Sequence, residues 1–301
     1  MSKQAFWGKL GLVVLSVLVI SFCGNVLFWS GLATGPQHIN IAPAAQQPSS
    51  APAMVDVPTV PETPCVTVDN RVPQMWAPTV RVRWEDAQAQ AGSMGSGVVF
   101  GRIGTYVYVL TANHVVETPT VQVKVTPCED GSVQIELAPV TLAPQYYIDF
   151  GVPGGLREIA VPASVVATSP KYDLAIIRFD YGTQNFPTAI ISGRGEYCPQ
   201  ILDDVWSAGY QLGRKALLTQ GQLVVERWDI LNDGLEFMET TASIMPGSSG
   251  GPVFALIDGD YKVIGVQLRW GGAPHLALSL PIKYFWTWYD EAKLAEVLCV
   301  P

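Results

Sequence analysis

A serine flanked by glycines is the strongest candidate for a nucleophile in this sequence. Residues 240–253 read Thr-Thr-Ala-Ser-Ile-Met-Pro-Gly-Ser-Ser-Gly-Gly-Pro-Val. Gly247 and the pair Gly250-Gly251 allow the backbone to turn tightly around Ser249, because glycine has no Cβ atom. Such a turn could direct the N–H groups of Gly247 and Ser249 toward a bound carbonyl while Ser249 Oγ attacks it. The same residues also suit an ordinary surface turn, so catalysis requires partners elsewhere.

The first partner that a serine hydroxyl needs near neutral pH is a base, usually a histidine. The chain has three histidines. His38 lies in a proline-rich segment, and His275 follows Gly-Gly-Ala-Pro in a predicted turn. His114 instead follows a β-branched and aromatic run at 106–111, which predicts a buried strand. We expect His114 to be the base, because the end of a strand would hold its imidazole in place.

The second partner is a carboxylate that orients the imidazole. Asp173 opens the apolar run Asp-Leu-Ala-Ile-Ile-Arg-Phe, so we expect it at the mouth of another strand. An aspartate that only caps this strand is the alternative. Asp149 precedes a Gly/Pro-rich segment and Asp180 ends the strand, which makes both weaker candidates. The order His114, Asp173, Ser249 is one in which a catalytic triad occurs.

Four ordered segments carry a family resemblance. They are Gly-Ser-Gly-Val-Val-Phe at 95–100, Leu-Thr-Ala-Asn-His-Val-Val at 110–116, Asp-Leu-Ala-Ile-Ile at 173–177 and Pro-Gly-Ser-Ser-Gly-Gly-Pro at 246–252. Together they resemble the signature blocks of trypsin-like serine proteases of the chymotrypsin fold. Residues 165–175 and 242–252 are most similar to the HtrA (Deg) branch. The resemblance spans roughly residues 92–282 and implies an all-β fold of two six-stranded β-barrels, a triad of His114, Asp173 and Ser249, and an oxyanion hole formed by Gly247 and Ser249.

Two features depart from that branch. His114 and Asp173 are 173 − 114 = 59 residues apart, which is longer than usual and implies an inserted hairpin or loop. Residues 121–125 and 133–137 alternate on either side of Glu-Asp-Gly at 129–131, which predicts a β-hairpin there. The chain ends soon after the protease-like region, so we do not expect the PDZ domain that the branch commonly carries.

The resemblance also implies a specificity pocket near Ser243, Ile244 and Gln267. Position 243 holds no acid, so we expect cleavage after small or medium apolar residues rather than after Lys or Arg. Residues 264–268 could pair with an extended substrate as an added strand. Position 248 is a serine, and no Ile-Val-Gly-Gly-like start is present, so activation through a buried N-terminal ammonium is not expected.

The elements that must position these residues follow from the apolar patterns. We predict a strand at 80–84, a loop at 87–96, a strand from 98, and a strand leading to His114. For the second barrel we predict strands at 205–210, 217–225 and 237–241. The tail, 282–298, predicts one amphipathic helix packed on the second barrel.

The N-terminal region predicts a membrane anchor. Residues 10–29 contain no charge, and a run of this length is about what a helix needs to cross a bilayer. Lys3 and Lys9 place residues 1–9 in the cytoplasm and predict export of the rest. A cleaved signal peptide with a site near 31–33 is the alternative. Residues 30–64, rich in Pro and Ala, predict a disordered linker, and 65–301 the protease domain.

Composition limits the remaining possibilities. A chain of 301 residues with 49% hydrophobic residues accommodates one two-barrel domain of about 200 residues and an appendage. The net charge of −8 and the lack of a long basic run do not favour nucleic-acid binding. No metal-ligand spacing is present, so we expect no metal and no cofactor. Besides Cys23, four cysteines (Cys65, Cys128, Cys198 and Cys299) predict two disulfides of open connectivity.

The sequence therefore predicts a membrane-anchored, extracytoplasmic serine endopeptidase acting on proteins or peptides. Two alternatives stay open. One is an inactive pseudoprotease that binds extended peptides, and the other is an esterase on the same scaffold.

Overall fold

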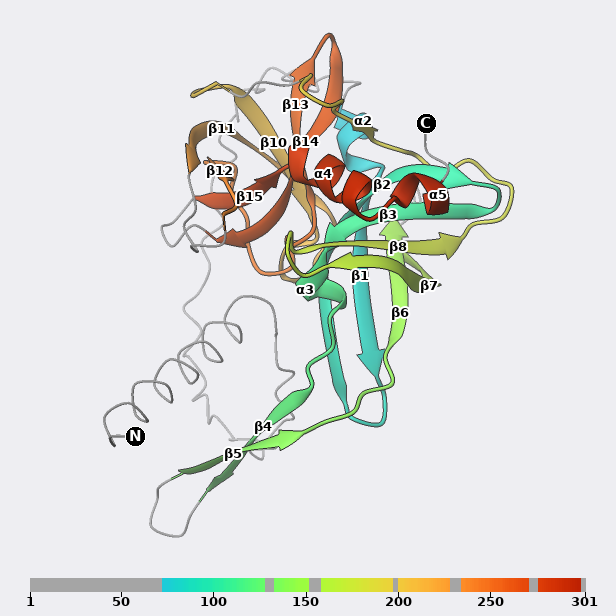
Figure 1. The fold of residues 1–301 in the computed structure, drawn as a ribbon, viewed down its shortest axis with the longest axis vertical. Helices are drawn as coiled ribbons and strands as arrows, with labels where there is room; N and C mark the ends of the chain where they lie inside the picture. Colours follow the sequence, from blue (N-terminus) through green and yellow to red (C-terminus); the bar gives the residue numbers. More distant parts are fainter. Residues whose placement is uncertain are drawn as a thin grey trace, which may run out of the picture. The chain divides into compact units, whose positions relative to one another are not determined.

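The first six-stranded barrel carries the elements around His114 and Asp173. A computed structural model describes residues 72–127, 133–151, 158–196, 200–227, 234–270 and 276–298, all within one compact unit. In the first barrel the antiparallel ring order is β1-β2-β3-β8-β7-β6 (Figure 1). Its strands are β1 (Thr79–Asp86), β2 (Ala91–Ile103), β3 (Tyr106–Ala112), β6 (Gln145–Gly151), β7 (Glu158–Ser169) and β8 (Leu174–Asp180).

The β1–β2 hairpin is tighter than the sequence predicted. The strand predicted at 80–84 is present, with Val80 and Val82 fully buried in the core. The predicted loop at 87–96 is wrong, because β2 already begins at Ala91. Asp86 Oδ1 accepts the N–H groups of Gln88 and Ala89, both at 2.9 Å, and so closes the turn within four residues.

The second barrel carries Ser249 and closes in the order β13-β10-β11-β12-β15-β14 through a β13–β14 pairing. The predicted strands in this region are confirmed. Its strands are β10 (Asp204–Gly209), β11 (Leu217–Arg227), β12 (Phe237–Thr240), β13 (Pro252–Ile257), β14 (Asp260–Trp270) and β15 (Ala277–Pro281). A two-residue strand, β9 (Ile190–Ile191), adds in parallel to β14. The all-β fold with two six-stranded barrels therefore agrees with the prediction.

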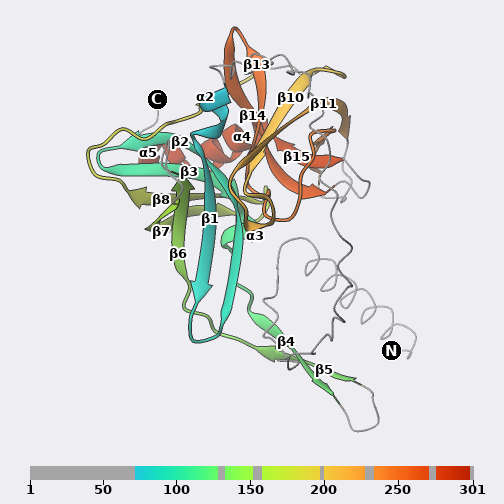
Figure 2. The same cartoon turned by 180° about the vertical axis from the view of Figure 1, so that it is seen from behind.

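The long interval between His114 and Asp173 contains a separate hairpin. Strands β4 (Val121–Pro127) and β5 (Val133–Pro139) pair only with each other among the described strands. Both views show this hairpin extending away from the first barrel, beyond the end of β1 (Figures 1 and 2). The predicted hairpin is confirmed, and its turn at 129–131 lies outside the described residues.

The C-terminal segment differs from the single helix that was predicted. Helix α4 (Lys283–Glu291) ends where Ala292 N–H donates to Trp288 O, and Lys293 adopts φ +50°. A left-handed residue just past a helix end is a common way to stop it. Helix α5 (Leu294–Leu298) then follows. The ring of Phe285 packs against Phe100 of β2 at 5.6 Å, so this segment also covers the first barrel.

Three shorter helices complete the described structure: α2 (Val72–Trp76), α3 (Asn113–Val116) and the 3₁₀ helix η1 (Gln211–Gly213). Among the described residues, no helix has the length and apolar character to cross a membrane. The predicted anchor at 10–29, the linker at 30–64, all five cysteines, His38 and His275 lie outside the described residues.

Candidate active site

His114 follows β3 directly and lies in the single-turn helix α3. Its position is fixed by Asp173, which comes just before β8, the strand paired with β3. The backbone N–H of His114 donates to Asp173 Oδ1 at 2.9 Å, and the ring atom Nδ1 lies 2.7 Å from Asp173 Oδ2. Asn113 N–H donates to the backbone oxygen of Asp173 at 3.0 Å. Three contacts thus join the two strand ends and set the orientation of the imidazole.

Asp173 adopts φ +51°, a conformation that aspartate tolerates better than most residues. This conformation lets one residue present both its carboxylate and its backbone oxygen to the 113–114 peptide. The side chains of His114 and Asp173 are 32% and 19% exposed, so the pair is partly shielded from water. A carboxylate at Nδ1 favours the tautomer with the proton on Nδ1, which leaves Nε2 as an acceptor.

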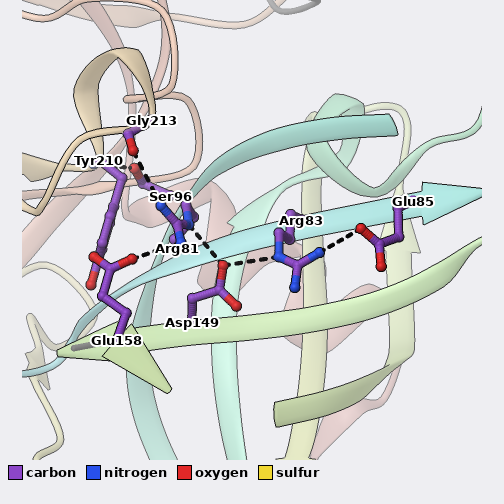
Figure 3. Close-up of polar contacts among 8 residues, drawn as sticks. All are labelled: Arg81, Arg83, Glu85, Ser96, Asp149, Glu158, Tyr210 and Gly213. Carbon is purple, nitrogen blue, oxygen red and sulfur yellow. Dashed lines mark hydrogen bonds and ion pairs between the residues drawn. The ribbon is translucent and has the colours of Figure 1, made fainter. Parts of the chain in front are cut away.

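The two competing aspartates have other partners. Asp149 does not lie at the edge of a loop but within β6, where it is 2% exposed. Its Oδ2 accepts from Arg81 Nε at 2.8 Å and from Arg83 Nε at 2.9 Å (Figure 3). Asp180 accepts the N–H of Gly182 in a surface turn. Neither makes a described contact with His114.

The serine loop is a tight turn held by backbone contacts. Ser248 N–H donates to Met245 O at 3.0 Å, and Gly247 adopts φ +96°. With Pro246 at the second position and a positive φ at the third, the turn fits type II. Ser249 O accepts the N–H of Ser96 in β2 at 2.7 Å, so the nucleophile candidate is attached to the first barrel.

Close packing places Ser249 beside the end of β3. A Cβ atom on Gly250 would overlap the backbone oxygen of Ser96 and lie 2.8 Å from Ala112 N. Ala112 is two residues before His114. Ser249 Oγ donates to Leu268 O at 3.3 Å, and among the described hydrogen bonds none joins Ser249 to His114. Rotation about the Ser249 Cα–Cβ bond changes the direction of the hydroxyl without moving the backbone.

The turn also orients one peptide unit at the site. Pro246 O accepts Leu212 N–H at 2.6 Å. Because a trans peptide is planar, the N–H of Gly247 points away from Leu212. Among the described hydrogen bonds, neither Gly247 N–H nor Ser249 N–H has an acceptor in the protein, so both are available to a bound oxygen.

Comparison with known proteins bears directly on this site. The family model described as trypsin-like peptidase domain matches residues 95–266, which contain His114, Asp173 and Ser249. The chain belongs to the trypsin-like peptidase domain family.

Several proteins named as serine endoproteases are similar to this peptidase domain in sequence. A probable periplasmic serine endoprotease DegP-like of Pseudomonas putida (strain W619) is 26% identical over 200 residues, 65% of this chain and 34% of the relative. A protein of the same name from Chlamydia pneumoniae is 30% identical over 185 residues, 61% of this chain and 30% of the relative. The chain thus spans about a third of the length of these relatives.

Solved structures agree in fold. The serine endoprotease from Yersinia pestis has a TM-score of 0.50 at 21% identity, covering 74% of this chain and 65% of that one. Deg5 has a TM-score of 0.52 at 17% identity, covering 72% of this chain and 90% of that one. An HtrA-type protease solved with a tripeptide has a TM-score of 0.52 at 22% identity, covering 74% of this chain and 62% of that one.

The residues predicted to form the specificity pocket of this peptidase domain differ in exposure. Ser243 and Ile244 are partly exposed, and Ser243 O accepts from Gln211 Nε2 at 3.0 Å and from Thr219 Oγ1 at 2.9 Å. Gln267 is only 1% exposed. Its Nε2 donates to Ala208 O at 3.2 Å and to Pro252 O at 2.9 Å, so its amide ties strands together.

The sequence does not reveal the residues that hold the serine turn from outside. In the sequence, Ser96 belongs to a signature block and Arg81 to a predicted strand. A serine between two glycines is the one available signal, and no pattern indicates which distant turn its hydroxyl contacts. Within the described part of the chain, no three His, Cys, Asp or Glu side chains group as metal ligands.

Proposed function

We propose that this chain is a serine endopeptidase in which Ser249 is the nucleophile, His114 the general base and then acid, and Asp173 the residue that orients the imidazole. The observation that carries the proposal is the double contact of Asp173 with the backbone and ring of His114, beside a glycine-rich serine turn. A residue other than glycine at positive φ is uncommon, and here that conformation turns the carboxylate and the backbone oxygen of Asp173 toward the 113–114 peptide.

The proposed reaction follows from these positions. His114 Nε2 takes the hydroxyl proton as Ser249 Oγ attacks the scissile carbonyl, and the new imidazolium is stabilised by Asp173. The N–H groups of Gly247 and Ser249 bind the oxygen that becomes negative. His114 then gives the proton to the leaving amine, which leaves an acyl group on Ser249. Water attacks this ester by the same route and restores the free serine.

Replacing Ser249 by alanine tests the proposal most directly. We expect Ser249→Ala to retain the fold and to lose at least about a thousandfold in kcat on an unfolded protein substrate. Ser164→Ala changes an exposed serine of β7 and serves as the control, with an unchanged rate. Equal rates for Ser249→Ala and the wild type would refute the role of Ser249.

A pseudoprotease is the second candidate, and one observation favours it. Ser249 Oγ donates to Leu268 O rather than to His114. An activated serine reacts with a peptidyl phosphonate, whereas an inactive one does not, so mass spectrometry of the treated protein separates the two. An esterase would also react with the phosphonate but would hydrolyse small esters and leave proteins intact.

Location and specificity are parts of the same proposal. We infer an extracytoplasmic protease domain behind an anchor at 10–29, supported by the charge pattern and by relatives named as periplasmic. Digestion by a protease added to cells whose outer envelope has been opened, with alkaline extraction of membranes, tests both points. We infer that Ser243, Ile244 and Gln267 line the pocket for small or medium apolar residues, which cleavage-site profiling on a peptide library would reveal.

A further inference from the structure

The Pro246–Gly247 peptide is the part of the serine turn that can point in two directions. Type I and type II turns differ by a half-rotation of their central peptide. In the observed type II form, the oxygen of Pro246 faces Leu212 and the N–H of Gly247 faces the opposite side. In the other form the oxygen would lie where the N–H now points. Pro246 and Gly247 themselves suit the type II form, and contacts outside the turn add to this preference.

Leu212 N–H holds this peptide directly at Pro246 O, and Ser96 holds the adjacent Gly247–Ser248 peptide. Ser96 lies in β2 of the first barrel and is 0% exposed. Its Oγ donates to Gly247 O at 2.6 Å and accepts Tyr210 N–H at 2.8 Å. Its own N–H binds Ser249 O, and its oxygen accepts Thr111 Oγ1 at 2.6 Å. One residue thus holds the turn on both sides of Ser248 and also fixes the start of loop 210–214.

Loop 210–214 supplies Leu212 N–H, the donor that holds Pro246 O. Leu212 adopts φ +54° and is exposed, so its own side chain does little to fix the loop. Contacts from both barrels fix the loop: Gln211 Nε2 donates to Ser243 O, and Arg81 Nη1 of the first barrel donates to Gly213 O at 3.2 Å (Figure 3). The guanidinium also lies 5.5 Å from the centre of the Tyr210 ring. Burial, more than the nearby Glu158 carboxylate, raises the pKa of the Tyr210 hydroxyl and keeps it neutral.

Two carboxylates fix Arg81 in turn. Its Nε binds Asp149 Oδ2 at 2.8 Å and its Nη2 binds Glu158 Oε2 at 2.7 Å. The side chains of Arg81 and Asp149 are 18% and 3% exposed, so this ion pair is well shielded from water. A planar guanidinium that binds two acids has one orientation left for its third contact, here the Gly213 carbonyl. Figure 3 shows all three contacts converging on Arg81.

We infer that Ser96 and Arg81 are positioning residues for the oxyanion turn. Ser96 binds the Gly247 carbonyl directly, and Arg81 acts through loop 210–214 and the Pro246 carbonyl. Together they keep the Gly247 N–H directed toward the site, although both belong to the other barrel. The inference deepens the proposed function and rests on it, because the role of the turn is to bind the oxygen of a tetrahedral intermediate.

A purely structural role for Ser96 makes different predictions. If its hydroxyl only satisfied two buried groups, its loss would lower stability and leave kcat of the folded protein unchanged. If it positions the turn, kcat falls while KM stays nearly constant, because the contact with the oxyanion exists only in the transition state.

Ser96→Ala is the main test, with a peptide substrate and a peptide aldehyde. We expect kcat to fall about 10-fold to 100-fold, a part of what loss of one oxyanion donor costs. Affinity for the aldehyde, whose adduct places an oxygen in the hole, should fall in parallel, and affinity for the cleaved product should not. Ser207→Ala is the matched control, since Ser207 is also buried and its Oγ has no described partner. Ser96→Cys retains the shape with a weak donor and should show the same kcat loss at a smaller cost in stability.

Arg81→Lys tests the second route. A lysine retains the charge beside Asp149 but cannot bind three partners in fixed directions, so we expect kcat to fall about 5-fold at constant KM. Arg83→Lys is its control. Arg83 also pairs with Asp149, and all of its described contacts lie in the first barrel. A kcat within twofold of wild type for Ser96→Ala, or equal losses in the two arginine variants, would overturn the inference.

A structural readout separates this inference from the proposed function. Crystal structures of Ser249→Ala and of Ser249→Ala/Ser96→Ala would show the Pro246–Gly247 peptide whether or not the wild type is active. We expect the peptide to be rotated or present in both orientations only in the double variant. An unchanged peptide there would refute the positioning role, whereas an inert wild type with a rotated peptide in the double variant would refute only the endopeptidase.

Discussion

The two halves of the candidate site are held in different ways. His114 and Asp173 are fixed by contacts within the first barrel, between the adjacent ends of β3 and β8. The serine turn belongs to the second barrel, yet Ser96 of the first barrel holds it at two carbonyls. A strand end is held by its neighbour in the sheet, whereas this turn, which has two accessible forms, is also held by contacts from the other barrel. The site therefore depends on the contact between the barrels for one half only.

This difference separates two kinds of damage. A change in the His114–Asp173 half should remove catalysis and leave the packing between the barrels intact. A change in the serine half should affect packing and catalysis together, because the same residues do both.

Asp173→Asn should cause the largest loss in the first half. The amide would still fill the space but would favour the wrong tautomer of His114, so we expect kcat to fall about 10⁴-fold. The thermal midpoint should move little. Asp180→Asn, at the opposite end of β8, is the control and should leave kcat unchanged. Comparable losses in both variants would argue against the role of Asp173.

Gly250→Ala should damage the second half through packing. The new Cβ atom would overlap Ser96 O and lie too close to Ala112 N, and the alanine would have to adopt the φ of +83° that Gly250 has. We therefore expect urea unfolding to show about 3 kcal/mol of lost stability, together with reduced activity. Gly259→Ala separates the two causes, because its φ is +89° but no atom lies within 4 Å of the new Cβ. That control should cost only about 1–2 kcal/mol. If the two variants lost equal stability, the close approach of the barrels at Gly250 would be irrelevant.

The sequence predicted the first half more completely than the second. One apolar run ends just before His114 and another begins just after Asp173, which showed the strand ends that would carry them, and the pairing of β3 with β8 brought these ends together. The glycines around Ser249 showed a turn, but not its form, which depends on Leu212 and Ser96. The predicted loop at 87–96 was wrong because the hydrogen bonds from Gln88 and Ala89 to Asp86 decide where β2 starts. Apolar periodicity gives no sign of these bonds. The single C-terminal helix failed for a similar reason, at the left-handed Lys293.

Asp86→Asn should affect stability alone and in a pH-dependent way. Hydrogen bonds from the N–H groups of Ala89, Ala143 and Gln88 hold the pKa of the Asp86 carboxyl below its usual range. A lowered folded-state pKa means that the stabilisation is complete above the unfolded pKa of about 3.9 and is lost as the pH falls through the folded pKa. The variant should therefore melt below the wild type at pH 7, and the difference should shrink as the pH is lowered below about 4. Its kcat should be unchanged, because Asp86 closes the far end of the β1–β2 hairpin and contacts neither half of the site. A difference in melting that is constant from pH 7 to pH 2 would show that the side chain acts by shape rather than by charge.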